Sequence, residues 1–326
     1  PAQIRRILSV DQVTAGMYEA FFGLRKKPFA LTPNTGFMVQ LAPYQACLNL
    51  LRVALGEGEG FIKVTGEVGT GKTLLCRALL NELDAARYQV AWLPNPTLTP
   101  MALRQALAHE LHIAEAADLD NHGLLTALHA RLIELAGQGK STVLLIDEAQ
   151  ALPTATLEAL RLLTNLETEH SKLLQVVLFG QPEFDVTLAR EDFRQLRQRI
   201  TFSYSLRPLD VSDATRYLHE RLAVAGYRGE PLFKAAAVRL LVRGSGGIPR
   251  LLNILANKCL MVAFGEGSRQ VLARHVRRAL EDTEGAKPFW RSATRFLGWK
   301  IAAGCLSLAL IAGAWPWLAH LTEVLL

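Results

Sequence analysis

GEVGTGKT, the stretch Gly66–Thr73, decides the fold of this chain, because it fits the phosphate-loop pattern G-x-x-x-x-G-K-[ST]. An apolar, β-like run over 61–65 precedes it, and a helix-like run over 74–83 follows it. In such a unit the glycines allow backbone N–H groups to face phosphate oxygens, and the positive end of the helix adds to the field. The pattern predicts a nucleotide site in which Lys72 reaches the β- and γ-phosphates and the Thr73 hydroxyl binds Mg²⁺. The residues expected to contact the nucleotide are Gly66, Glu67, Val68, Gly69, Thr70, Gly71, Lys72, Thr73 and Leu74.

A second segment supplies carboxylates at the end of a strand. Residues 142–146 form a short apolar run that is typical of a buried parallel strand, and the run ends in Asp147-Glu148-Ala149-Gln150. In a doubly wound sheet this strand end lies beside the phosphate loop. We therefore expect Asp147 to hold Mg²⁺ through water, and Glu148 to orient and deprotonate the attacking water. The alternative is a solvated pair of carboxylates at the end of a strand.

Strand-like and helix-like runs alternate up to residue 206. We expect strands near 61–65, 89–93, 142–146, 174–179 and 200–206, and helices near 44–55, 73–84, 100–112, 123–136, 154–166 and 183–198. This alternation predicts an α/β fold, a parallel five-stranded αβα sandwich of the P-loop NTPase kind. Beyond Leu206 the β pattern stops. Four helical runs near 210–225, 231–243, 248–264 and 270–282 predict a small all-α lid domain.

The chain of 326 residues is long enough for one large domain or two modest ones. The predicted boundaries are 1–16 for an N-terminal arm, 17–206 for the ATPase core, 207–284 for the helical lid, 285–300 for a basic linker, 301–319 for a transmembrane helix and 320–326 for a short tail. The net charge of +6 is compatible with nucleic acid or an anionic membrane as a partner and is diagnostic of neither. The four cysteines lack metal-binding spacing, which predicts reduced core residues of a cytosolic domain. No signal peptide is visible in residues 1–16.

An uncharged apolar run, Ile301–Ala319, follows a basic stretch. Its nineteen residues are just enough to span a bilayer. Trp299, Trp315 and Trp317 lie near its two ends as interfacial anchors, and the basic residues place its N-terminal side in the cytoplasm. These basic residues are Lys287, Arg291, Arg295 and Lys300. The alternative is an apolar helix docked on the ATPase core or in an oligomer. Only seven residues follow the run, so we expect a tail anchor without an outer domain.

Further polar residues are candidates for the reaction. Gln181 closes a strand-like run, so we expect it to face the γ-phosphate and help to position water; a turn before Pro182 is the alternative. Arg199, and after it Arg197, are candidates for an arginine finger that acts on a neighbouring subunit; a solvated basic helix face is the alternative. Arg250 lies in the first turn of a helix, where a cation is unfavourable. A nucleotide phosphate beside it would explain its position, and a capped turn is the alternative.

We expect the adenine pocket between the helical lid and the N-terminal segment, which is the loop-rich stretch from Met17 to the helix that begins at Tyr44. The candidates are Pro28-Phe29, Leu31-Thr32-Pro33-Asn34 and Tyr44. Ordinary packing at a domain edge would account for the same residues equally well.

With these pieces placed, the chain resembles the AAA+ ATPases. Among them it is similar to the secretion-associated ExeA/GspA group, and most of all to the MshM group of MSHA type IV pilus biogenesis. The resemblance covers roughly residues 17–284. It rests on 17–24, 28–29, 31–34, 58–63, 66–77, 147–153, 160–167, 179–183, 194–200 and 247–252. The phosphate loop and the acidic strand end are shared with many unrelated ATPases, whereas the flanking stretches are specific to this group.

The resemblance implies ATP and Mg²⁺ as cofactors, with Walker A roles for Gly66, Gly71, Lys72 and Thr73 and Walker B roles for Asp147 and Glu148. It places Gln181 and Arg250 at the two sensor positions, and Arg199 at the end of the arginine-rich helix before the last core strand. It implies a homo-oligomeric ring at the bacterial inner membrane, with pilus or secretion assembly proteins as partners. The secretion members continue past the membrane span into a periplasmic peptidoglycan-binding domain that this sequence lacks, which puts direct cell-wall binding in doubt. Residues 1–16 also fall outside the family pattern.

Three classes of function compete. The first is a membrane-anchored ATPase that assists assembly of a pilus or a related envelope machine. The second is a nucleic-acid-associated ATPase of the transposition type. We find no helix-turn-helix, zinc module or dense basic stripe in the sequence, so no nucleic acid is expected as a partner. The third is a nucleotide-switched scaffold with little turnover, which the presence of Glu148 disfavours.

Overall fold

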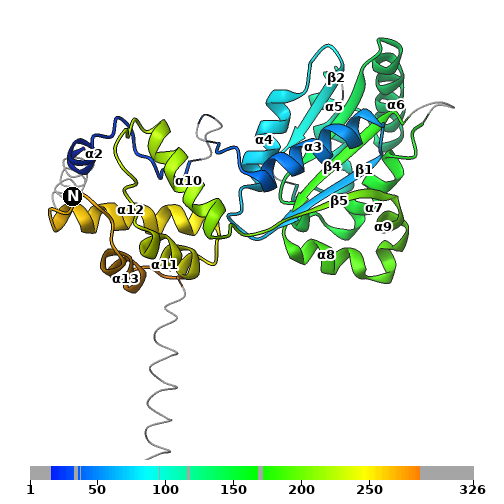
Figure 1. The fold of residues 1–326 in the computed structure, drawn as a ribbon. Coiled ribbons are helices and arrows are strands. Elements are labelled where there is room, and N and C mark those ends of the chain that lie inside the picture. The colour runs from blue at the N-terminus through cyan, green and yellow to red at the C-terminus, as the bar shows by residue number, and fades with distance from the viewer. Residues whose placement is uncertain are drawn as a thin grey trace, which may run out of the picture.

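A parallel five-stranded sheet with the order β2-β3-β4-β1-β5 forms the centre of the larger part of the molecule (Figure 1). The computed structural model describes residues 16–286 except 33–35, 37, 95, 115, 117 and 168–171. The strands are β1 (Phe61–Gly66), β2 (Tyr88–Leu93), β3 (Ser141–Ile146), β4 (Leu174–Gly180) and β5 (Ile200–Leu206). They begin and end within one residue of the predicted runs, which confirms the predicted sheet.

The side chains of the central strands alternate between two cores, one on each face of the sheet. Val177 and Phe179 of β4 belong to the core beneath α3 and α4, while Val176 and Leu178 belong to the core beneath α5 to α8. The helices of this part are α3 (Ala42–Gly56), α4 (Lys72–Glu82), α5 (Pro100–Glu110), α6 (Asn121–Gly137), α7 (Thr154–Leu163), α8 (Pro182–Ala189) and α9 (Arg194–Arg199). Since both faces are covered, β3 and β4 are buried and read as continuous apolar runs.

The predicted helix over 183–198 is wrong as a single element. It is divided into α8, a short 3₁₀ helix at Glu191–Phe193, and α9. The break lies at Arg190, whose extended backbone (φ −61°, ψ 150°) cannot continue an α-helix. The change of direction lets both Phe193 and Leu196 enter the core, where each is fully buried.

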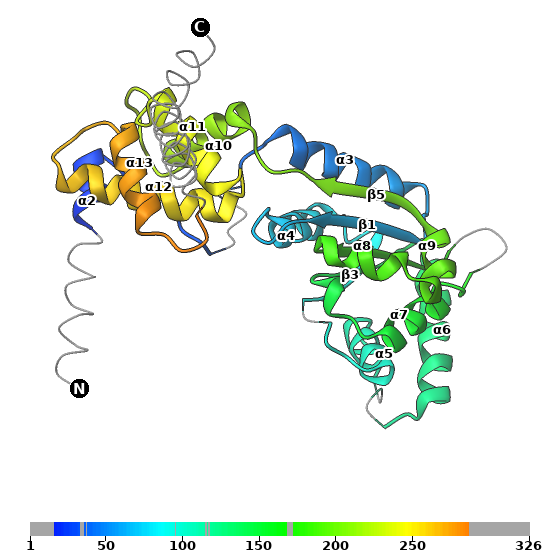
Figure 2. The ribbon, with the colours of Figure 1, turned by 90° about the horizontal axis from the view of Figure 1, so that it is seen from below.

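Four helices follow the sheet and form a second, smaller body in the described part of the chain (Figures 1 and 2). They are α10 (Val211–Val224), α11 (Ala235–Ser245), α12 (Pro249–Gly265) and α13 (Ala273–Glu281). They match the predicted helical runs in number and order. Their role as a lid over a nucleotide stays a prediction.

A helix that the sequence reading missed, α2 (Met17–Phe22), packs against this smaller body. The Tyr18 hydroxyl donates to the Asn257 side-chain oxygen over 2.8 Å, and the rings of Phe21 and Phe264 pack edge to face. The Arg25 N–H donates to the Ala225 carbonyl over 2.7 Å. Residues 17–25, which the sequence assigns to the ATPase core, therefore contact the helical body. Figure 2 shows α2 beside α12, whereas α3 runs along β5.

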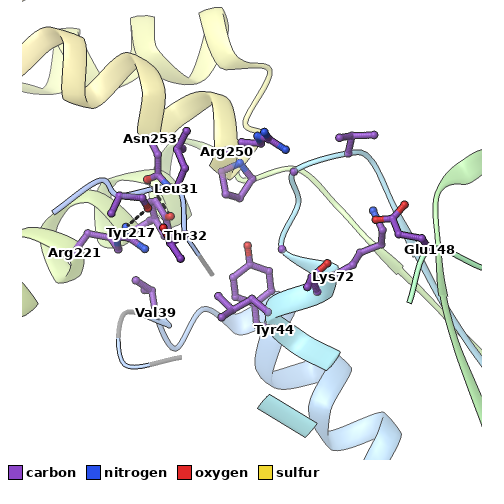
Figure 3. A pocket seen from close by; sticks show the side chains of 17 residues that line it. Leu31, Thr32, Val39, Tyr44, Lys72, Glu148, Tyr217, Arg221, Arg250 and Asn253 are labelled. Atoms are coloured by element: carbon purple, nitrogen blue, oxygen red, sulfur yellow. Dashed lines mark hydrogen bonds between the residues drawn. The ribbon is translucent and has the colours of Figure 1, made fainter. Parts of the chain in front are cut away.

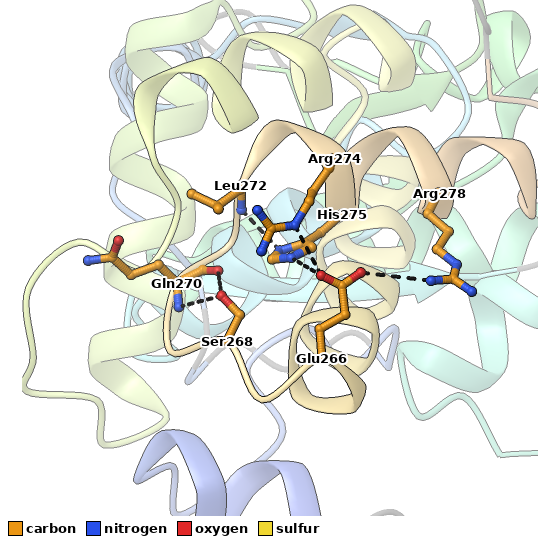
Figure 4. Close-up of polar contacts among 7 residues, drawn as sticks. All are labelled: Glu266, Ser268, Gln270, Leu272, Arg274, His275 and Arg278. Atoms are coloured by element: carbon orange, nitrogen blue, oxygen red, sulfur yellow. Dashed lines mark hydrogen bonds and ion pairs between the residues drawn. The ribbon is translucent and has the colours of Figure 1, made fainter.

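Glu266, directly after α12, ties α13 to that helix (Figure 4). Its Oε2 accepts hydrogen bonds from Arg274 Nε and from His275 Nε2, both over 3.0 Å. The other ring nitrogen of His275, Nδ1, accepts the Leu272 N–H over 3.1 Å. These contacts assign the proton of the neutral ring to Nε2. The hydrogen bond from Arg274 is the main cause that holds the pKa of the Glu266 carboxyl below its usual value.

The connection from β5 to α10 lies against the start of α12. The Leu209 N–H donates to the Gly247 carbonyl over 2.8 Å. Gly247 has φ +73°, and a Cβ there would lie 2.2 Å from the Leu209 carbonyl oxygen. Only glycine fits this approach, which fixes where α12 begins relative to the sheet.

Within the residues that the structure describes, no helix is both long and apolar enough to cross a bilayer. Four predicted segments lie outside the described residues. They are the N-terminal arm up to residue 15, the basic linker from residue 287, the span Ile301–Ala319 and the tail. Of the cysteines, Cys47, Cys76 and Cys259 are described; each is buried, and burial raises the pKa of each thiol.

Candidate nucleotide site

The phosphate loop connects the end of β1 to the start of α4. Gly69 and Gly71 have φ values of +83° and +98°, in the left-handed region that favours glycine. The Thr70 N–H and hydroxyl both donate to the Glu67 carbonyl, over 3.2 and 2.8 Å. The Tyr44 hydroxyl, from α3, donates to the Thr70 carbonyl over 2.8 Å. The left-handed conformations of the two glycines and these hydrogen bonds therefore hold the phosphate loop in its turn.

Lys72 is buried within this turn. Its Nζ donates to the Gly66 and Glu67 carbonyls over 2.8 and 3.0 Å. Burial lowers the pKa of the Lys72 ammonium, and the nearby carboxylates of Glu148 and Asp147 oppose that shift. The ammonium group therefore lies inside the loop that is predicted to bind phosphates.

Asp147, at the end of β3, lies against the first turn of α4. Burial raises the pKa of its carboxyl, and a hydrogen bond with Thr73 opposes the shift. The hydroxyl of Thr73 and the carboxylate of Asp147 are hard oxygen donors, and Mg²⁺ is usually held by one or two protein ligands together with water and phosphate oxygens. These two residues fit the Mg²⁺ site predicted from the sequence.

Glu148 and Gln181 are brought together from the ends of β3 and β4. The Gln181 Nε2 donates to Glu148 Oε2 over 2.9 Å. A second amide, Gln150 Nε2, donates to the same oxygen, and Gln150 Oε1 accepts the Gln181 N–H over 3.0 Å. Glu148 and Gln181 therefore lie side by side, and their predicted roles toward the attacking water and the γ-phosphate stay predictions. The sequence predicts no role for Gln150 beyond its place at the end of the strand.

A cavity of about 400 Å³ opens between the phosphate loop and the helical body (Figure 3). Its walls include Leu31, Thr32 and Tyr44, three of the residues predicted for the adenine pocket. Phe29 is buried elsewhere and packs edge to face against Phe233. Pro33 and Asn34 lie outside the described residues. Lys72, Thr73 and Glu148 also line the cavity, and Figure 3 shows Lys72 and Glu148 across from Leu31 and Thr32. The cavity therefore joins the phosphate loop to the pocket predicted for the base.

Three further cavity residues with polar side chains were not predicted from the sequence: Tyr217 and Arg221 on α10, and Asn253 on α12. The Tyr217 hydroxyl donates to Asn253 Oδ1 over 3.0 Å. Arg221 Nε and Nη2 donate to the Pro28 and Ala30 carbonyls over 2.7 and 3.1 Å. Arg221 thus fixes the backbone of the N-terminal segment as one wall of the cavity. The sequence does indicate that Arg221 is buried, because it lies on the same face of α10 as the apolar residues Leu218 and Leu222.

Arg250, in the first turn of α12, also lines the cavity. Its backbone N–H donates to the Gly69 carbonyl over 3.1 Å. A Cβ at Gly69 would lie 2.7 Å from the Arg250 Cβ. The helical body therefore contacts the phosphate loop directly at the residue predicted as its sensor.

Arg199 and Arg197 lie away from this cavity. Because β1 and β5 run parallel, with Phe61 beside Ile200 and Gly66 beside Leu206, Arg199 lies at the end of the sheet opposite the phosphate loop. Arg199 Nη1 contacts the Thr164 hydroxyl oxygen over 3.4 Å, and Arg197 Nη1 donates to the Ala189 carbonyl over 3.1 Å. Neither residue serves the nucleotide site of its own chain, and a role in a neighbouring subunit stays a prediction.

A comparison with protein families matches residues 55–188 to the family model described as AAA domain. The matched range contains the phosphate loop, Asp147, Glu148 and Gln181. Residues 55–188 are therefore similar to an AAA domain, and the phosphate loop and parallel sheet of this part of the chain are those of a P-loop ATPase fold. The family match and the arrangement of Lys72, Thr73, Asp147 and Glu148 in this domain agree with the fold predicted from the phosphate loop.

Beyond the AAA domain, the chain is similar to the general secretion pathway protein A of Aeromonas hydrophila, with 40% identity over 304 residues. This match covers 92% of the chain and 54% of the relative, so the chain spans about half the length of that protein.

Among solved structures, the Aeropyrum pernix ORC2 protein in its ADPNP–ADP complexes aligns with a TM-score of 0.57 and 15% identity, over 77% of this chain and 72% of that chain. The Aeropyrum pernix ORC1 protein in complex with DNA aligns with a TM-score of 0.57 and 20% identity, over 79% of this chain and 69% of that chain. At these identities, the likeness shows a shared fold and no more.

Proposed function

We propose that the AAA domain binds ATP with Mg²⁺ in the cavity between the phosphate loop and the helical body, and hydrolyses it. One observation carries this proposal: Lys72, Thr73, Asp147 and Glu148 meet at a single place, where one wall of the cavity is the phosphate loop. Lys72 and the loop N–H groups would bind the phosphates, and Thr73 and Asp147 would hold the metal ion. Mg²⁺ would neutralise charge on the phosphates when bound.

Glu148 is the proton acceptor in this proposal. It takes a proton from water as the water oxygen bonds to the γ-phosphorus, while the bond to the bridging oxygen breaks and its electron pair leaves with ADP. Gln181 helps to orient the water. The helices α10 to α12 act as the lid, with Arg250 as the residue that senses the nucleotide.

We further propose that the chain is anchored in the bacterial inner membrane by Ile301–Ala319, with the AAA domain in the cytoplasm, and assists assembly of a secretion-related machine. The 40% identity to general secretion pathway protein A supports the secretion context. The finer proposal is a machine that assembles an MSHA-like type IV pilus, as the sequence resemblance implies. The active form would be a homo-oligomeric ring, since the arginines of α9 lie far from their own nucleotide site.

That nucleic acid is not a partner stays a prediction, since a protein that aligns with this fold was solved in complex with DNA. A scaffold that binds ATP with little turnover is the other alternative, and the presence of Glu148 in the wall of the cavity beside Lys72 favours hydrolysis over it.

One experiment tests both the activity and the anchor. Membranes that carry the full chain are washed with high salt and then with carbonate, and phosphate release from ATP is measured in the pellet with Mg²⁺ or with a chelator. We expect Mg²⁺-dependent release to stay in the pellet through both washes, because a span of about 20 apolar residues resists them.

Two controls make the outcome specific. Membranes with the Lys72→Ala chain give the background, and a chain that lacks residues 297–326 should appear in the soluble fraction. If membranes with the Lys72→Ala chain release as much phosphate as membranes with the unchanged chain, the proposed ATPase activity is wrong. Release of the full chain by salt alone would mean attachment through basic residues, and the spanning helix would be wrong.

A further inference from the structure

Gln150 connects the two residues that are proposed to act on the attacking water. It lies in the short 3₁₀ helix Ala149–Ala151, which begins directly after Glu148. Its amide nitrogen donates to Glu148 Oε2, and its amide oxygen accepts the Gln181 N–H over 3.0 Å. A single side chain therefore fixes the carboxylate at the end of β3 relative to the end of β4.

Gln181 completes the arrangement from the other side. Its Nε2 donates to the same oxygen, Glu148 Oε2, over 2.9 Å. Within the part of the chain that the structure describes, Oε2 is the oxygen of Glu148 that accepts hydrogen bonds from both amides. This leaves Oε1 as the oxygen available to take a proton. The two oxygens of Glu148 thus have different tasks, one for positioning and one for chemistry.

The backbone of Glu148 also needs support. Its φ of +55° lies in the left-handed region, which residues with a Cβ rarely adopt. The Glu148 N–H donates to Asp147 Oδ1 over 3.0 Å, and the two amides hold the other end of the residue. Such a conformation persists where surrounding contacts determine it.

We propose that Gln150 is a positioning residue that holds Glu148 for the hydrolysis of ATP. This inference rests on the proposed function of the same site. Gln150 acts through Glu148 and Gln181, and needs no contact with the nucleotide.

The test is the Gln150→Glu substitution in the full chain. It keeps the side-chain length and the oxygen that accepts the Gln181 N–H, but it replaces the donor to Glu148 with a second carboxylate. We expect kcat to fall by about 10- to 100-fold, because a misplaced general base loses part of the roughly 10²- to 10⁴-fold that a well-placed one contributes. The KM and the equilibrium Kd for ATP should stay within about threefold of the unchanged protein, because binding uses the phosphate loop.

A matched control lies on the surface of α6. Gln138 Nε2 donates to Glu134 Oε1 over 3.2 Å, so Gln138→Glu makes the same chemical change in an exposed amide–carboxylate pair. It should leave kcat unchanged. Gln150→Asn, which is neutral and one methylene shorter, should give an intermediate loss of kcat, and it replaces Gln150→Glu if that variant does not fold.

A double-mutant cycle with Gln150→Ala and Gln181→Ala separates positioning from general support of the fold. Since both amides hold one oxygen, the double variant should lose little more kcat than the worse single variant. The inference would be overturned if the losses of kcat in the two single variants multiply in the double variant. It would also be overturned if the Gln150→Glu protein keeps a kcat within about twofold of the unchanged protein. Suppose that the unchanged chain hydrolyses ATP, that the Glu148→Gln protein does not, and that the Gln150→Glu protein hydrolyses ATP as fast as the unchanged chain. In that case only this inference fails. If the unchanged chain does not hydrolyse ATP, the proposed function fails and this inference with it.

Discussion

The Glu148→Gln protein is expected to keep ATP bound while its turnover falls by about 100-fold or more, the lower range of what a general base contributes. The substitution keeps the shape of the side chain, and the new amide oxygen can still accept from Gln150 and Gln181. It cannot take a proton from water. The phosphate loop, Thr73 and Asp147 are untouched, so the Kd for ATP should change little.

Two assays read this result: phosphate release at saturating ATP, and retention of radiolabelled ATP on a filter. Glu183→Gln is the control, because Glu183 is an exposed carboxylate at the start of α8 near the same site. Equal turnover in the Glu148→Gln protein would contradict the assignment of Glu148 as the residue that activates water.

Arg199→Ala is expected to reduce turnover by about 1,000-fold, as removal of an arginine finger does when the finger is supplied by a neighbour. The reason is geometric: Arg199 lies at the opposite end of β5 from the phosphate loop of its own chain. Its effect on hydrolysis must then come through a second subunit. Activity of the unchanged protein should accordingly rise with protein concentration.

Mixing distinguishes this role from a structural one. Arg199→Ala and Lys72→Ala proteins are each inactive in the proposal, but a mixed assembly contains interfaces with an intact phosphate loop on one side and an intact arginine on the other. Turnover should therefore return in part on mixing. Arg216→Ala, which removes an exposed arginine paired with Glu220, should behave like the unchanged protein. If neither Arg199→Ala nor Arg197→Ala lowers activity, the finger lies elsewhere or does not exist.

The sheet and the phosphate loop could be predicted because local sequence determines them. GEVGTGKT needs glycine at two left-handed positions, and Gly69 and Gly71 adopt them. The apolar runs of β3 and β4 have the composition that burial on both faces requires. Asp147, Glu148 and Gln181 follow from the same rule, since the carboxyl ends of neighbouring parallel strands meet at one edge.

The cavity walls could not be predicted in the same way, because they depend on contacts between distant segments. Arg221 reaches the carbonyls of Pro28 and Ala30 across more than 190 positions of sequence, and no local pattern encodes that pairing. Gln150 has a role only because β4 brings Gln181 beside it. The break at Arg190 was missed because the polar and apolar pattern on its two sides still fits one helix, while burial of Phe193 requires the chain to turn.

Photolabelling of the full chain with 8-azido-ATP and Mg²⁺ shows whether ATP binds in the cavity between the phosphate loop and the helical body. Digestion and mass spectrometry then locate the labelled peptide. We predict label on residues 30–32, on the stretch of α10 that contains Tyr217 and Arg221, or at Asn253, because these line the part of the cavity away from Lys72. Excess ATP should remove the label. Label on peptides outside the cavity, or label that ATP does not displace, would mean that ATP does not bind in this cavity.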